Sequence, residues 1–125
     1  MPADIDVLTH EATARMTTRE VVRQLNNHLG ATLVATLAGV RDRGLPYKWA
    51  REDGPEPRPE SYQRLQAAHR AWTMISNSDN DHVARAWFIG ANPRLGEQAP
   101  VMCLRSGEVA AVLAAATAFL SGSDD

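Results

Sequence analysis

The chain has 125 residues, a formal net charge of −2 at pH 7 and 44% apolar residues. This length and composition predict one globular domain, or two very small units, and argue against a general polyanion binder. Its single cysteine, Cys103, excludes an intramolecular disulfide. No apolar stretch approaches the ~20 residues of a membrane span and the start does not resemble a signal peptide, so we expect a cytoplasmic protein with no membrane partner.

The N-terminal part is predicted to be a mobile arm followed by a helix. Residues 1–16 show no clear periodicity. A capping box, Thr17-x-x-Glu20, then starts a helix, because each of its side chains can bond the other residue's backbone N–H. Valine and leucine residues follow at helical spacing as far as Gly30, a typical C-terminal stop.

Two short helices are predicted next. Residues 31–40 are apolar nearly all round, with Gly39 as the stop, so we expect this helix to be buried. Pro46 suits the first turn of a helix, because its missing N–H needs no partner there, and this helix is expected to run to about Glu52. The proline-rich residues 53–59 are expected to form a loop.

The second half is predicted to be helical throughout, with helices over about 60–75, 81–89, 100–105 and 108–120. The first of these carries a stripe of mostly apolar residues spaced three or four apart, formed by Tyr62, Leu65, His69, Trp72 and Ile75. No segment alternates as a strand does. We therefore predict an all-α fold in which an N-terminal unit (17–56) is joined by the proline-rich loop to a C-terminal unit (57–125).

The helices at 31–40 and from Pro46 have the spacing of a helix-turn-helix. Ala35 lies four residues before Gly39, where the motif needs a small residue and then a turn. Trp49 is placed to lock the second helix onto the first, and the interruption before Pro46 makes that helix short. The alternative is a structural helical hairpin without DNA contact.

Basic residues cluster around this motif. Residues 41–70 carry seven Arg and Lys against five Asp and Glu, whereas residues 71–125 carry three against six. Arg and Lys can hold phosphates or read guanine in the major groove, although such charges also occur on solvated helix faces. The residues predicted to bind DNA are Arg41, Arg43, Tyr47, Lys48 and Arg51.

The sequence offers little for catalysis. The four histidines, at positions 10, 28, 69 and 82, lack the paired spacing of a metal site, and His69 fits a core histidine better than a ligand. Cys103 lies in an apolar run and is expected to be a small buried side chain. No nucleotide-binding or nucleophile motif is present, so we expect no catalytic residue, metal or cofactor, and no enzyme.

The region from Ala84 onward has a specific order of residues. A tryptophan, an Asn-Pro turn, several glycines and a Pro-started helix come in sequence as Trp87, Gly90, Asn92-Pro93, Leu95-Gly96, Pro100, Arg105 and Gly107. This order resembles the C-terminal toxin-binding domain of the Xre/MbcA/ParS antitoxin family. The resemblance covers about residues 60–120, and in that family a helix-turn-helix precedes this domain.

The resemblance implies a type II antitoxin that binds operator DNA through its N-terminal unit and regulates its own operon. Its C-terminal unit would block a RES-domain toxin, an enzyme that consumes NAD. The residues expected to face the toxin are Trp87, Asn92, Arg94, Leu95, Arg105, Glu108 and Phe119. Two alternatives remain, a stand-alone helix-turn-helix transcriptional regulator with no toxin partner and a small helical adaptor.

A homodimer is also expected. The predicted helices of residues 60–120 carry more apolar surface than two thin helical layers cover, contributed by Leu65, Trp72, Val109, Val112 and Phe119. A two-fold symmetric dimer would match two operator half-sites about one DNA turn apart.

Overall fold

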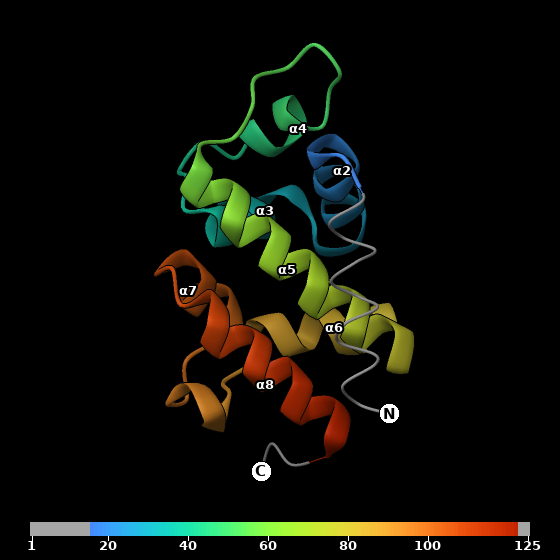
Figure 1. Ribbon diagram of the computed structural model, residues 1–125, viewed down its shortest axis with the longest axis vertical. Helices are drawn as coiled ribbons and strands as arrows, with labels where there is room; N and C mark the ends of the chain where they lie inside the picture. Colours follow the sequence, from blue (N-terminus) through green and yellow to red (C-terminus); the bar gives the residue numbers. More distant parts are fainter. Residues whose placement is uncertain (1–15, 123–125) are drawn as a thin grey trace.

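The computed structural model describes residues 16–122 (Figure 1). Its helices are α2 (Thr18–Leu29), α3 (Ala31–Ala38), α4 (Leu45–Trp49), α5 (Pro59–Ser78), α6 (Asp81–Ile89), the 3-10 turn η1 (Pro93–Leu95), α7 (Pro100–Arg105) and α8 (Val109–Ser121). Within residues 16–122 there is no strand, which confirms the all-α prediction. Residues 1–15 of the expected mobile arm lie outside the described residues, as do residues 123–125.

The capping box predicted at the start of α2 is present. The Thr17 hydroxyl accepts a hydrogen bond from the Glu20 backbone N–H, and the Glu20 carboxylate accepts one from the Thr17 N–H, both at 3.2 Å. Asn80 caps α6 in the same way, because its side-chain oxygen accepts from the Val83 N–H at 3.0 Å. These caps satisfy backbone donors that a helix start leaves without partners, so both helices begin where local sequence requires.

Helix α5 is the central element of the fold. It runs diagonally through the middle of the molecule, with α2 and α4 above it, α3 passing behind it and α6, α7 and α8 below it (Figure 1). It packs against α2 and α3 as well as against α6, α7 and α8. Helix α3 also packs on α7. The two units predicted from the sequence therefore share one interface, in which α2 and α3 contact α5 and α3 contacts α7.

One hydrophobic core extends through both halves. Its largest fully buried side chains come from every helix except α4, and they include Leu25, Leu37, Leu65, Ile75, Phe88, Leu104 and Val112. Helix α4 contributes Trp49, which is buried as predicted. Burial of this apolar surface is the main favourable contribution to folding, and here it stabilises both halves together.

Some predicted boundaries and burials were wrong. Helix α5 continues to Ser78 rather than ending at Ile75, because the Asp79 N–H still bonds the Ile75 carbonyl, at 2.9 Å. The stripe predicted along α5 is buried only in part, since Tyr62 is exposed and Trp72 is half-buried. Helix α4 ends at Trp49, three residues before the predicted end, so it makes little more than one turn.

Candidate functional site

The turn between α3 and α4 depends on a glycine. Gly39 has φ of +87°, and its N–H and that of Val40 both bond the Ala35 carbonyl at 3.1 Å, which closes the end of α3. A Cβ on Gly39 would lie 2.2 Å from the nearer guanidinium nitrogen of Arg64. The positive φ therefore favours glycine here, at the position where a helix-turn-helix changes direction, whereas the flexible end of Arg64 could move aside for a Cβ.

Helix α4 has a buried face and an exposed face. Pro46 and Trp49 are buried, whereas Tyr47 is 63% exposed and Lys48 is exposed. Arg51 is exposed too, but it lies beyond the end of the helix rather than on it. Three predicted DNA-binding side chains are thus accessible around one short anchored helix.

The two remaining predicted DNA-binding residues, Arg41 and Arg43, are exposed in the turn before α4. Asp42 lies between them and organises the turn, because one of its carboxylate oxygens accepts from the Gly44 N–H at 2.8 Å. Its other carboxylate oxygen lies 4.0 Å from the Lys48 ammonium nitrogen. The structure therefore brings the predicted set into one contiguous segment, residues 41–51.

Carboxylates accompany the cations of this segment. Arg51 Nε lies 3.8 Å from an Asp53 oxygen, and Lys48 is paired with Asp42. Ion pairs between exposed side chains contribute little to stability. These pairings therefore leave both cations able to exchange a carboxylate for a phosphate.

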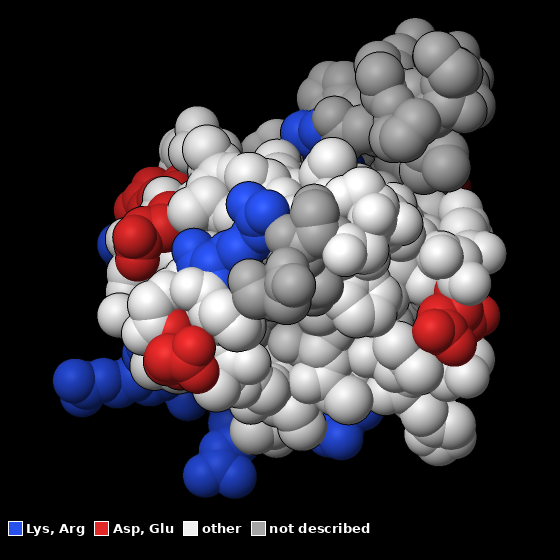
Figure 2. Space-filling model, turned by 90° about the horizontal axis from the view of Figure 1, so that it is seen from below, with Lys and Arg blue, Asp and Glu red and all other residues white. Residues whose placement is uncertain are grey.

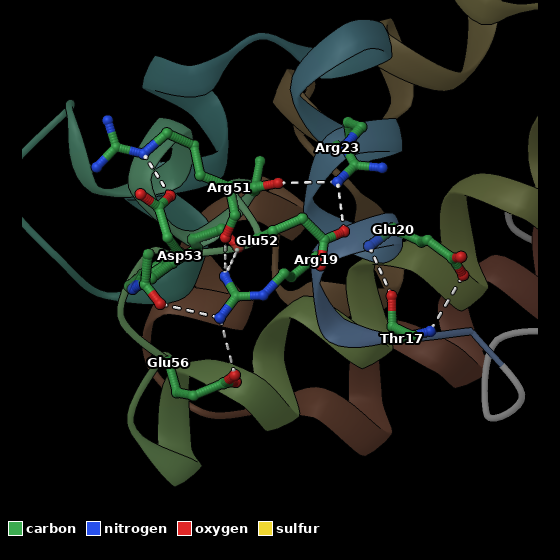
Figure 3. A network of polar contacts seen from close by, with 11 residues as sticks. Thr17, Arg19, Glu20, Arg23, Arg51, Glu52, Asp53 and Glu56 are labelled. Atoms are coloured by element: carbon green, nitrogen blue, oxygen red, sulfur yellow. Dashed lines mark hydrogen bonds and ion pairs between the residues drawn. The ribbon is translucent and has the colours of Figure 1, made fainter.

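Helix α2 contributes contacts that sequence reasoning missed. The Arg19 guanidinium donates to backbone carbonyls around the end of α4 and to Glu56 in the following loop, and Arg23 donates to the Ala50 carbonyl (Figure 3). Asn26, one turn further along α2, donates to the Pro46 carbonyl at 3.1 Å. The only sequence signal was the spacing of polar residues on one helical face, which does not identify backbone partners 20 or more residues away.

The turn after α6 is organised by Asn92. Its carbonyl accepts from the N–H groups of Leu95 and Glu97, both at 2.9 Å, and its side-chain oxygen accepts from the Arg94 N–H at 2.9 Å. Its own N–H donates to the Gln98 carbonyl at 3.1 Å, which closes the loop. The Asn-Pro motif therefore builds a compact corner between α6 and α7.

Three residues predicted to face a partner have internal roles instead. Trp87 is 8% exposed and packs edge-to-face on Phe88, with ring centroids 5.2 Å apart. Asn92 is buried within the corner. Arg105 donates to the Thr36 carbonyl at 2.9 Å, so it ties α7 to the end of α3 and is not a freely replaceable surface residue.

The other predicted partner residues are at least partly accessible. Arg94 and Glu108 are exposed, and Leu95 and Phe119 are half-buried against the core. Two exposed apolar side chains were missed, Ile89 at the end of α6 and Met102 on α7, which are 50% and 47% exposed. Both belong to the helices that flank the corner, α6 and α7.

The face seen from below carries separate clusters of charge. Figure 2 views the molecule from below and shows mostly uncharged residues between separate acidic and basic clusters.

Between α5 and α8 lies a groove of about 360 Å³, lined by Tyr62, Val109, Leu113 and polar side chains of α5. Leu65 and Val112, in contrast, are buried in the core, so they supply none of the apolar surface on which the dimer prediction depended.

The residues considered for chemistry are buried. His69 bonds Gln24 through Nε2 at 2.8 Å, and burial lowers its pKa from 6.5 to about 4. Burial raises the pKa of the Cys103 thiol and the Glu108 carboxylate raises it further, which disfavours the nucleophilic thiolate. Among the described residues, no group of three or more His, Cys, Asp or Glu side chains is arranged to hold a metal ion.

Two further findings concern membrane-spanning helices and similarity to known proteins. Among residues 16–122, no helix is both long enough and apolar enough to cross a membrane. Comparisons of the chain with protein-family models, with curated proteins and with solved structures give no match.

Proposed function

We propose that this chain is a DNA-binding antitoxin that neutralises a RES-domain toxin and regulates its own operon as a homodimer. The observation that carries the DNA-binding part is the α3–α4 unit. Pro46 and Trp49 anchor α4 in the core, while Tyr47 and Lys48 on the same helix stay accessible. The toxin-binding part is supported by the resemblance of residues 60–120 and by the exposed apolar residues beside the corner.

The charges around α4 suit a phosphate backbone. Lys48 and Arg51 each lie beside one exposed carboxylate, and Arg41 and Arg43 are exposed nearby. Binding of DNA would replace these weak pairs with phosphate contacts and release counterions from the duplex. The side chains of α4 and of the turn before it would then contact phosphates of the DNA backbone together.

Lys48→Ala and Arg51→Ala are each expected to weaken binding to a duplex taken from the region upstream of the protein's own gene. If each residue contacts one phosphate, each change should make the negative slope of log K against log salt concentration shallower by about 1. The measurement is fluorescence anisotropy at several salt concentrations. Arg85→Ala is the matched control, because it removes the same charge from α6, below α5 in Figure 1. Parent-like binding by both variants and by their double would contradict DNA binding through α4.

The toxin-binding part makes a separate prediction. Ile89→Glu and Met102→Glu should abolish growth rescue in cells that express the RES-type toxin of the same locus, because apolar anchors dominate most interfaces. Both side chains are exposed, so the variants should keep the parent's circular dichroism and melting temperature. Tyr62→Glu, a similarly exposed aromatic position on α5, is the matched control.

The rescue experiment uses the full chain, because α5 is buried against α2 and α3. Lys48→Ala combined with Arg51→Ala should still rescue growth, since toxin binding does not need DNA contact. If the folded parent neither rescues growth nor co-purifies with the toxin, the antitoxin proposal is wrong.

A stand-alone transcriptional regulator is the second candidate. The observation in its favour is that Trp87, Asn92 and Arg105 all have internal contacts, so much of the corner stabilises the chain itself. In that case the C-terminal half would support the DNA-binding unit and the dimer without a toxin partner. DNA binding by the parent without any rescue of growth would select this candidate.

A further inference from the structure

Helix α2 presents a stripe of hydrogen-bond donors toward α4. Arg19, Arg23 and Asn26 are spaced four and three residues apart, so they share one face of the helix. All three donate to backbone carbonyls between residues 46 and 54, and we name them the α2 donor stripe. The stripe thus spans α4 from its first turn to the loop that follows it.

Arg19 makes the largest share of these contacts. Its guanidinium donates to the carbonyls of Trp49 at 3.1 Å and Gly54 at 2.9 Å, and also to the carbonyl of Arg51. It lies 3.2 Å from a Glu56 carboxylate oxygen as well, and its side chain is only 17% exposed. A planar guanidinium with five N–H donors can satisfy such a set, whereas the ammonium group of a lysine cannot reach all of it.

The other two members hold the neighbouring carbonyls. Arg23 donates to the Ala50 carbonyl at 3.0 Å and lies 3.7 Å from a Glu52 oxygen. Asn26 donates to the Pro46 carbonyl at 3.1 Å. Between them, Arg19 and Arg23 therefore place positive charge at the C-terminal end of α4, where the helix dipole favours it.

A helix as short as α4 needs this external support. Five residues are too few for a helix to be stable in water. Beyond the N–H groups of the two residues that follow α4, which bond the Pro46 and Lys48 carbonyls, donors for the end of α4 come from α2. The loop after α4 is also held close to it, because a Cβ on Gly54 would lie 1.8 Å from the Lys48 carbonyl oxygen. Burial of Pro46 and Trp49 and the contacts from α2 to its carbonyls thus act together on the orientation of α4.

We propose that the α2 donor stripe is a positioning device for base reading, with Arg19 as its central positioning residue. This inference rests on the proposed DNA-binding function and extends it to a residue on a helix outside the α3–α4 unit. Arg19 acts through α4 and the following loop, because its guanidinium is directed at their backbone rather than at solvent (Figure 3). Its loss should therefore impair sequence discrimination more than the attraction to phosphates.

Arg19→Lys is the decisive variant, because it keeps the charge and removes the planar fork. Binding is measured to a duplex from upstream of the protein's own gene and to a scrambled duplex of equal length and composition. Affinity for the first duplex should fall about tenfold or more, affinity for the scrambled duplex should stay near that of the parent, and the salt slope should not change. Arg85→Lys is the matched control, since Arg85 also donates to a backbone carbonyl of another helix, that of Leu29 at the end of α2, but makes no hydrogen bond with α4 among the described residues.

Hydrogen exchange of the free protein provides the second readout. Amides of residues 45–54 should exchange faster in Arg19→Lys than in the parent, and Arg85→Lys should leave them unchanged. Unchanged exchange in Arg19→Lys, or faster exchange with undiminished discrimination, would overturn the positioning role. A parent that binds neither duplex would overturn the proposed DNA-binding function instead, and the exchange data would still report whether Arg19 holds α4.

Discussion

Trp87→Ala is expected to lower the free energy of unfolding by about 3–5 kcal/mol. The indole is 8% exposed, and it packs edge-to-face on Phe88, which is fully buried. Removing the ring would leave a cavity beside that side chain and forfeit both the apolar burial and the aromatic contact. Urea unfolding followed by circular dichroism measures the change.

Two comparisons give this result its meaning. Trp72→Ala should cost less than Trp87→Ala, because Trp72 is half-buried, and Ile89→Ala should cost least, because Ile89 is 50% exposed. If Trp87→Ala keeps the parent's urea midpoint but fails to bind its partner, then the tryptophan is an interface anchor and its assignment to the core is wrong.

The second large effect is a loss of stability in acid that depends on His69. Burial lowers the pKa of His69 from 6.5 to about 4, so the unfolded chain takes up a proton at a higher pH than the folded chain does. The contribution of the neutral His69 side chain to the free energy of unfolding is therefore fully present above pH 6.5. It falls as the pH drops and is lost at about pH 4. Over that interval the free energy of unfolding should fall by up to about 3 kcal/mol.

Urea midpoints measured between pH 7.5 and pH 4.5 test this expectation. His69→Gln removes the titrating group, so the difference between parent and variant isolates it from other groups that titrate in the same interval. The variant should lose stability less steeply than the parent below pH 6.5. Equal slopes for the two proteins would show that His69 takes up its proton without opposing folding.

Local signals predicted most of the helices. The capping box at Thr17, the glycine stop at Gly39 and the proline at the start of α7 each act within a few residues, so their consequences can be derived from neighbouring positions. Burial of Trp49 and accessibility of Lys48 followed from their neighbouring positions on one short helix, which point in different directions. The exposed basic segment could therefore be outlined without a structure.

Long-range polar contacts could not be predicted in this way. Arg19 meets carbonyls that are 30 or more residues away, and Arg105 meets the Thr36 carbonyl 69 residues away. A backbone carbonyl leaves no mark in the sequence, because every residue has one. The contact between Arg105, expected on the partner-facing side, and the Thr36 carbonyl at the end of α3 is therefore one that no sequence pattern indicates.

The central position of α5 limits how this chain can be recombined. Its buried residues contact helices from both ends of the sequence, so the proline-rich loop before it is not a boundary between independently exchangeable modules. A gene fusion that joined residues 57–125 to a different N-terminal unit would have to supply a new apolar surface for α5 in place of α2 and α3. Under the proposed DNA-binding function, we therefore expect specificity to diversify by substitution on the exposed side of α4 rather than by exchange of the N-terminal half.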